Sequence, residues 1–186
     1  RTSFKKYLHE IEKLHTPAID STRDLVAIPY SSGTTGVPKG VMLTHYNLVA
    51  NILQIEATHS EADSTDIIMG CLPFFHIYAL ELVVNYCIFK GVTVVVMPKF
   101  DLEQYLQLIE KYKATYLYLV PPIALGLAKS PLVDKYDIKS IRQIVSAAAP
   151  LAAEVEEALA KRLRVSVKQA YGMTELSPVS HITPRG

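Results

Sequence analysis

The residues best suited to chemistry in this sequence lie in one stretch of ten, residues 31–40, which reads SSGTTGVPKG. It holds three glycines, four hydroxyl side chains and one lysine, directly after an apolar run over residues 25–30. Glycine allows a tight turn and a close approach of the backbone to a ligand. Hydroxyls and free N–H groups in such a turn form a concave set of donors for phosphate oxygens, and Lys39 adds a positive charge. The stretch therefore predicts a phosphate-binding loop, with an ordinary surface turn as the alternative.

Spacing excludes one type of phosphate loop. A Walker-type loop needs a glycine, four further residues, and then Gly-Lys followed by Ser or Thr. Counted from Gly33, the second glycine would fall at Pro38, and Lys39 is followed by Gly40. The sequence is therefore not that of a P-loop NTPase.

Two further motifs follow along the chain: LPFFHIY at residues 72–78 and YGMTE at residues 171–175. Together with YSSGTTGVPKGV at residues 30–41, and in the same order, they resemble the signatures of the adenylate-forming superfamily. This family comprises acyl- and aryl-CoA ligases, beetle luciferases and peptide-synthetase adenylation domains. The stretches at 128–137 and 174–178 are most similar to 4-coumarate–CoA ligases and luciferase-like acyl-CoA synthetases. The resemblance runs from about residue 24 to the end of the sequence.

The resemblance implies that a carboxylate reacts with Mg-ATP to give an acyl-adenylate and pyrophosphate. Thr174 would bond the α-phosphate, Glu175 would ligate Mg²⁺, and Tyr171 with Gly172 would contact adenine, beside Gln169. Without the resemblance, Thr174 and Glu175 suit a helix N-cap with an acid in the first turn, and Tyr171 suits the core. The β- and γ-phosphates would be bound by the 31–40 stretch, through Ser31, Ser32, Gly33, Thr34, Thr35, Gly36 and Lys39.

The acyl side of the predicted site is centred on His76, which resembles the family histidine beside the acyl carboxylate. A lone histidine in an apolar loop is otherwise more often a hydrogen-bonded structural residue. His76, Lys39, Thr174 and Glu175 are the predicted catalytic residues. Relatives usually have Ser-Gly where this chain has Ser146-Ala147. The added methyl of Ala147 can narrow the pocket or restrict the backbone at that position. The predicted pocket walls are Phe75, Tyr78 and the 146–150 run, which includes Ala147, Ala148 and Ala149.

The elements that must position these motifs alternate between strand and helix. Such alternation predicts a layered α/β domain with a mainly parallel sheet flanked by helices, and ligands bind such sheets at the carboxyl ends of strands. The β-branched run at 92–97 predicts a strand covered on both faces. A helix at 79–90 should stop at Gly91, and Thr44 and Asp101 should cap helices. Strands are predicted at 25–30, 67–71, 92–97, 115–120, 141–147 and 165–170, and the other helices at 45–57, 102–112, 121–129 and 151–163.

Composition limits the kinds of partner. The 186 residues are 49% hydrophobic and 20% charged, with a net charge of +1, which is typical of a soluble globular protein and does not indicate nucleic acid. The most apolar region, 77–97, contains charged residues, so no membrane span is predicted. Cys71 and Cys87 have no metal-ligand spacing and apolar neighbours, which favours buried thiols and a reducing cytosol.

The sequence is expected to be a piece of a longer protein or a designed chain, because it has no initiator methionine. Residues 1–24 are predicted to form a short amphipathic helix and a linker. Residues 25–186 are predicted to form a truncated core subdomain of the adenylate-forming type. Family members continue with a ribose-binding motif, a hinge and a mobile domain that carries a catalytic lysine. We therefore expect ATP and a small aromatic or fatty acid as partners, with CoA used only by the full-length enzyme.

Two functional hypotheses remain open at this stage. The chain is either a minimal catalyst of acyl-adenylate formation or a folded, non-catalytic module that at most binds ATP weakly. Either form is expected to self-associate through apolar surface exposed by truncation, and sedimentation at high concentration tests this.

Overall fold

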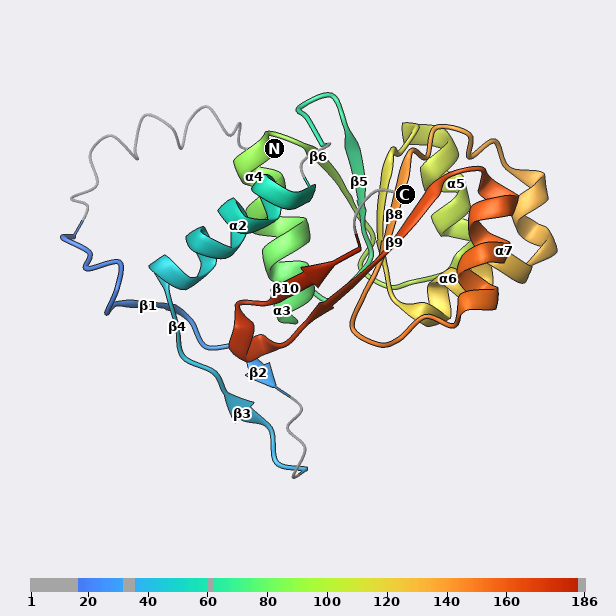
Figure 1. Cartoon of the computed structure of the whole chain (residues 1–186). Helices are drawn as coiled ribbons and strands as arrows, with labels where there is room; N and C mark the ends of the chain where they lie inside the picture. Colours follow the sequence, from blue (N-terminus) through green and yellow to red (C-terminus); the bar gives the residue numbers. More distant parts are fainter. Residues whose placement is uncertain (1–16, 32–35, 60–61, 184–186) are drawn as a thin grey trace.

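The computed structural model describes residues 17–31, 36–59 and 62–183. Its largest element is a six-stranded sheet with the strand order β10-β9-β8-β7-β5-β6 (Figure 1). All neighbouring strands are parallel except β9 and β10, which are antiparallel. This confirms the predicted α/β class. The strands are β5 (Ile67–Gly70), β6 (Thr93–Val96), β7 (Tyr116–Leu119), β8 (Gln143–Ser146), β9 (Ser166–Gly172) and β10 (Val179–Ile182).

Helices cover both faces of this sheet, with α2, α3 and α4 on one side and α5, α6 and α7 on the other (Figure 1). The Oδ1 atom of Asp101 caps α5 by accepting from the N–H of Gln104 at 2.8 Å, and Thr44 accepts from the N–H of Asn47 at 3.3 Å. Both predicted caps are confirmed. The long helices are α2 (His45–His59), α5 (Leu102–Tyr112), α6 (Pro121–Lys129) and α7 (Ala153–Leu163).

The strands in the middle of the sheet are covered on both faces. All residues of β7 and β8 are buried. The same prediction for the 92–97 run is wrong, because β6 lies at the edge of the sheet and Val96 is 56% exposed. A run of β-branched residues does not distinguish an edge strand from a central one.

The predicted helix at 79–90 is present but is not uniform. It consists of α3 (Ile77–Ala79), a π-helical segment η1 (Leu80–Asn85) and α4 (Tyr86–Lys90), and it ends at Gly91 with φ of 68°. Such π segments occur frequently at functional sites. Here the segment carries Glu81, which is fully buried.

The single strand predicted at 25–30 is in fact two short strands, because Pro29 cannot donate a ladder hydrogen bond. β1 (Leu25–Ala27) pairs with β4 (Leu43–Thr44), and β2 (Tyr30–Ser31) pairs with β3 (Lys39–Gly40). The β2–β3 hairpin projects from the body of the molecule (Figure 1). The predicted helix in residues 1–24 lies largely outside the described residues, as do Ser32, Gly33, Thr34 and Thr35.

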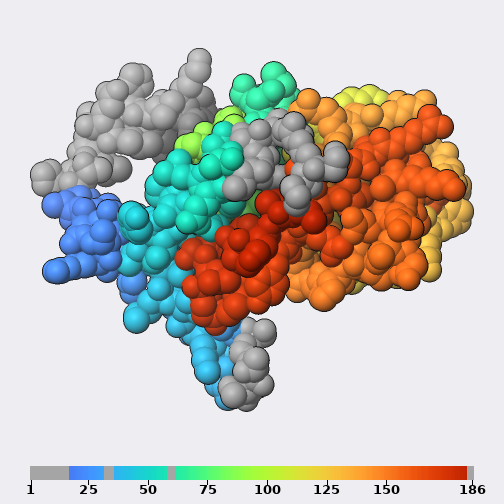
Figure 2. All heavy atoms as spheres, viewed as in Figure 1, coloured from blue at the N-terminus to red at the C-terminus, as the bar shows by residue number. Residues whose placement is uncertain are grey.

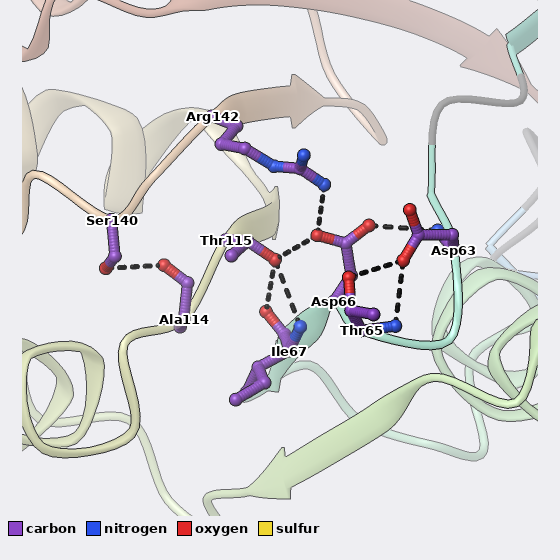
Figure 3. Close-up of polar contacts among 8 residues, drawn as sticks. All are labelled: Asp63, Thr65, Asp66, Ile67, Ala114, Thr115, Ser140 and Arg142. Carbon is purple, nitrogen blue, oxygen red and sulfur yellow. Dashed lines mark hydrogen bonds and ion pairs between the residues drawn. The ribbon is translucent and has the colours of Figure 1, made fainter.

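The amino ends of β5, β7 and β8 are tied together by a buried carboxylate (Figure 3). Asp66 is 1% exposed and accepts from the Thr115 hydroxyl at 2.7 Å and from the Arg142 guanidinium. Its second oxygen accepts from the N–H of Asp63 at 2.9 Å. These contacts fix the relative position of three central strands at the edge opposite to the predicted motifs.

The structure can be compared with the sequence predictions about membrane spans and cysteines. No helix in the described parts of the chain is long and apolar enough to cross a membrane. Both cysteines are free thiols; Cys87 is buried as predicted, whereas Cys71 is only half-buried. Burial raises the pKa of Cys71 to about 11 and that of Cys87 to about 12.

Candidate functional site

One cavity of about 730 Å³ lies where the three motifs converge. Its walls come from the β2–β3 hairpin, the start of α3, the residues after β8, the end of β9 and most of the turn into β10. Because the parallel strands deliver their carboxyl ends to this edge, motifs far apart in the sequence meet here. The predicted site residues that line the cavity are Ser31, Lys39, His76, Tyr78, Ala147, Ala148, Tyr171, Gly172, Thr174 and Glu175.

The β2–β3 hairpin supplies hydroxyl and cationic groups to one end of the cavity. Ser31 and Lys39 are direct partners in the antiparallel register, so their side chains lie on the same face. Ser31 is 9% exposed, and its Oγ has no hydrogen-bond partner among the described residues. Gly36 has φ of 84°, the left-handed region that favours glycine. An unpartnered buried hydroxyl beside a lysine suits an anionic ligand.

The second polar group is the η3 turn (Thr174–Leu176), which joins β9 to β10. Thr174 is buried and Glu175 is exposed at the cavity. Thr174 does not cap this turn, because Met173 holds the N-cap position. The turn is closed by the N–H of Met173, which donates to the carbonyl of Pro178 at 3.1 Å. A Cβ on Gly172 would lie 2.4 Å from the same carbonyl oxygen, so only glycine fits there.

His76 has a structural hydrogen bond and still faces the cavity. Its Nδ1 accepts from the N–H of Tyr78 at 3.2 Å, and His76 is thereby the N-cap of α3. A neutral imidazole that accepts at Nδ1 carries its proton on Nε2. His76 is exposed at the cavity, so Nε2–H is a donor that a bound carboxylate could use.

The side of the cavity predicted to bind the acyl group is apolar, and hydrogen bonds fix the position of Tyr78 there. Tyr78 is buried, and its hydroxyl lies 3.3 Å from the carbonyl oxygen of Leu119 and 3.2 Å from that of Val145. Burial raises the pKa of Tyr78, so the phenol stays protonated and donates within the fold. Its ring meets that of Tyr118 edge-on, with centroids 6.4 Å apart.

The alanine run after β8 also contributes to this wall. Ala147 donates its N–H to the carbonyl of Leu119 at 3.1 Å, and its backbone is not in the left-handed region, so its methyl is accommodated without strain. The left-handed residue is instead Ala148, with φ of 72°. The methyl of Ala147 therefore acts on the shape of the cavity and not on the backbone.

Some of the predicted site residues, Gly36 among them, do not line this cavity. Gln169 does not line the cavity, because its amide joins β9 to α7, accepting from the N–H of Leu151 at 3.1 Å and donating to Glu156. Ala149 also lies outside the lining. Phe75 is 83% exposed and borders a separate apolar cavity at the ends of β5, β6 and β7.

Sequence reasoning missed the apolar residues that α2 and β10 contribute. Ile55, Val179 and Ile182 line the cavity, together with Leu82 from the π segment. Figure 2 shows the β10 surface, in red, directly against the cyan surface of α2. Ile55 lies in the helix that the sequence predicts at 45–57 and is buried, but the pattern does not show that this part of the helix borders a cavity.

The similarity of this chain to known proteins is consistent with the three motifs that meet at the cavity. The sequence matches the family described as AMP-binding enzyme over residues 2–186. It is 47% identical over 171 residues to the probable 4-coumarate–CoA ligase 1 of Dictyostelium discoideum, covering 90% of this chain and 31% of that protein. The chain thus spans about a third of the length of this curated relative.

Solved structures show the same fold. ATP-bound MatB from Rhodopseudomonas palustris matches with a TM-score of 0.83 and 32% identity, over 92% of this chain and 33% of that one. A natural red-emitting luciferase from Phrixothrix hirtus matches with a TM-score of 0.83 and 31% identity, over 93% and 34%. On the sequence match and the arrangement of its motifs, the chain belongs to the AMP-binding enzyme family.

Proposed function

We propose that this chain carries the carboxylate-activating part of an AMP-forming acyl- or aryl-CoA ligase. In this reaction a carboxylate oxygen attacks the α-phosphorus of ATP, a new acyl–phosphate bond forms, and the bond to pyrophosphate breaks. The observation that carries the proposal is the single cavity that joins Ser31, Lys39, Thr174 and Glu175 to an apolar wall, with His76 also on its lining.

The chain's own residues would contribute mainly positioning and charge compensation, which suffice for much of phosphoryl and adenylyl transfer. Lys39 and Ser31 would hold the phosphates that leave as pyrophosphate. Thr174 would donate to the α-phosphate, and His76 Nε2–H would orient the attacking carboxylate. Tyr171, which is 58% exposed at the cavity, offers a ring face for adenine.

Magnesium fits this donor set as a partner of ATP. Among the described residues there is no cluster of three or more His, Cys, Asp or Glu side chains that could hold a metal alone. Mg²⁺ usually takes one or two carboxylates together with phosphate oxygens and water. Glu175 is the carboxylate that would supply the protein's share, and the cation would offset charge on the phosphates.

The apolar wall supports an acid with an aromatic or fatty acyl group. Ile55, Leu82, Val179 and Ile182 present no ionisable group there, and the Tyr78 hydroxyl is already engaged. The relative from Dictyostelium is named for an aromatic acid, coumarate. Transfer of the acyl group to CoA belongs to the whole protein in this proposal, and the free thiols suit the cytosol.

Calorimetric titration of Mg-ATP tests the nucleotide half of the proposal. We expect binding by the parent and its loss in the double variant Thr174→Ala/Glu175→Ala. Glu157→Ala, which removes an exposed carboxylate of α7 away from the cavity, is the control and should bind as the parent does. Absence of heat at millimolar Mg-ATP would favour the alternative of a folded, non-catalytic module.

Pyrophosphate release tests the chemical half. The parent should release pyrophosphate with Mg-ATP and cinnamate or hexanoate, and Lys39→Ala should slow the release about 100-fold, a typical loss for one charge-stabilising group. Release that does not depend on the acid, or that Lys39→Ala leaves unchanged, contradicts acyl-adenylate formation at this site.

A further inference from the structure

A buried amide on α2 holds the strand that forms the apolar wall. Asn51 is 2% exposed and lies 128 residues before Val179 in the sequence. Its Nδ2 donates to the carbonyl of Val179 at 2.7 Å, and its Oδ1 accepts from the N–H of Val179 at 3.2 Å. The second Nδ2 hydrogen is used by Gln54, whose Oε1 lies at 3.1 Å. Both ends of the amide are therefore committed.

These bonds replace the strand neighbour that β10 lacks. β10 is the last strand of the sheet, pairs only with β9 among the described strands, and has an irregular register between Val179 and His181. On its β9 side, Val179 is the partner of Gly172, where the backbones approach too closely for a side chain. On the other side, Asn51 binds both backbone groups of Val179, as a further strand would.

The position of Val179 matters because it lines the cavity, as do Pro178 and Ile182. The turn that carries Thr174 and Glu175 ends where β10 begins. Because Asn51 fixes the first residue of β10, it fixes the apolar wall and the far end of that turn together. Figure 2 shows this red segment seated against α2.

We propose that Asn51 is a positioning residue that sets the acyl selectivity of the site, by holding Val179 and the β10 wall in place. This inference rests on the proposed function, because the wall is taken to contact an acyl group. Asn51→Asp keeps the size of the side chain but cannot donate to the Val179 carbonyl. Asn51→Leu removes both bonds and leaves two buried backbone groups unsatisfied.

The test compares two non-hydrolysable acyl-sulfamoyl adenosines, one acetyl and one cinnamoyl, binding to the whole protein in a calorimeter. The cinnamoyl group extends farther from the adenylate than the acetyl group does, so it should make the larger contact with the β10 wall. We expect Asn51→Asp and Asn51→Leu to weaken the cinnamoyl analogue about tenfold and the acetyl analogue less than about twofold, in line with the loss of one buried hydrogen-bonded contact.

The matched control is Gln143→Leu. Gln143 is also a buried amide that bonds to backbone, donating to the carbonyl of Ser166 at 3.3 Å, but at the amino end of β8. It should lower the melting temperature and leave the ratio of the two affinities unchanged. If both Asn51 variants also leave the ratio of the cinnamoyl and acetyl affinities unchanged, the inference about Asn51 is overturned and the proposed function is not. Parent protein that binds neither analogue would overturn the proposed function, and the inference with it.

Discussion

At the scale of single residues, Gly172 makes the sharpest steric demand in the site. A Cβ there would lie 2.4 Å from the backbone oxygen of Pro178, and the backbone cannot move without shifting β10. We expect Gly172→Ala to lower the free energy of unfolding by about 2 kcal/mol, as overpacking does, and to abolish Mg-ATP binding. Urea unfolding and calorimetry measure the two effects.

Gly126 provides the control for that substitution. It lies in α6, where a Cβ would meet the side chain of Leu102 at 3.7 Å, an ordinary contact. Gly126→Ala should raise the free energy of unfolding by about 0.5 to 1 kcal/mol, because glycine is unfavourable within a helix. A Gly172→Ala protein that is as stable as the parent and binds Mg-ATP would contradict the close approach of β9 and β10.

A second prediction at this scale concerns Glu81 and pH. Burial raises the pKa of Glu81 from 4.5 to about 7, with one bond, from the amide of Asn85 at 2.8 Å, acting in the opposite direction. A carboxyl group with a higher pKa in the folded state binds its proton more tightly there, so stability falls as pH rises from about 4.5 to 7.

Glu81→Gln should remove this loss. At pH 8 the variant should exceed the parent in free energy of unfolding by about 3 kcal/mol more than it does at pH 4, since each pKa unit corresponds to about 1.4 kcal/mol and the pKa rises from 4.5 to about 7. The free energies of unfolding of both proteins are measured by denaturation at pH 4, 6 and 8. The difference between the two proteins at each pH cancels the contribution of all other titrating groups. Parallel pH profiles for the two proteins would show that Glu81 titrates normally.

Residue types predicted the Ser, Gly and Lys groups of the 31–40 stretch, and the family resemblance added Thr174 and Glu175, but neither predicted the residues that hold them in place. The Ser, Thr, Gly and Lys residues of the motifs have few other reasons to occur together. The contacts of Gln169 could not be predicted, because its position beside the YGMTE motif does not reveal that its amide bonds to Leu151 and to Glu156 of α7. Asn51 was missed because one asparagine in a helix is indistinguishable from a surface residue until β10 is placed beside it.

At the scale of elements, the contacts of Asp66 should contribute to the stability of the fold but not to Mg-ATP binding. Asp66 joins the starts of β5, β7 and β8, at the edge of the sheet opposite to the cavity (Figure 3). Asp66→Ala should lower the free energy of unfolding by about 3 kcal/mol, because it leaves buried donors without an acceptor. Mg-ATP affinity at temperatures where the variant is folded should not change.

An exposed ion pair provides the comparison for that network. Lys113 and Asp137 lie 3.2 Å apart, with side chains 59% and 54% exposed. Asp137→Ala should cost less than about 0.5 kcal/mol, as exposed pairs generally do. If Asp66→Ala costs no more than Asp137→Ala, the carboxylate does not hold the three strands.

The elements that the sequence pattern predicted correctly are those with long periodicity or clear caps, such as α5 with Asp101. The sequence pattern failed where the structure of a segment depends on the elements packed beside it. It could not show that β6 is an edge strand, or that the 77–90 helix contains a π segment. It also missed β10, because four residues after a Ser-Pro turn become a strand only by pairing with β9.

At the scale of the whole molecule, the alternation of strands and helices predicts the layered α/β fold, because few other arrangements bury continuous apolar strands. The cavity itself follows less directly. Its polar end comes from motifs at the carboxyl ends of strands, but its apolar wall depends on how α2 packs against β10. That packing brings together residues more than a hundred positions apart, as Asn51 and Val179 show.

This division of the molecule predicts its pattern of hydrogen exchange. Amides of β7 and β8, buried and paired on both sides, should exchange slowest, by opening that approaches global unfolding. The β2–β3 hairpin, which has only the pairs Tyr30–Gly40 and Ser31–Lys39, should exchange fastest among the described strands. Mass spectrometry of exchanged peptides distinguishes these segments.

Mg-ATP should change this pattern locally. Bound phosphates would stabilise the β2–β3 pairing and the η3 turn, so we expect exchange to slow about tenfold or more at residues 30–31, 36–40 and 172–179, a change that corresponds to about 1.4 kcal/mol of local stabilisation. The amino ends of β5 and β7, around Asp66 and Thr115, should show no local slowing of exchange, because they lie across the sheet from the cavity. Binding that slows exchange around Asp66 and leaves the hairpin unchanged would place the nucleotide elsewhere and refute the site.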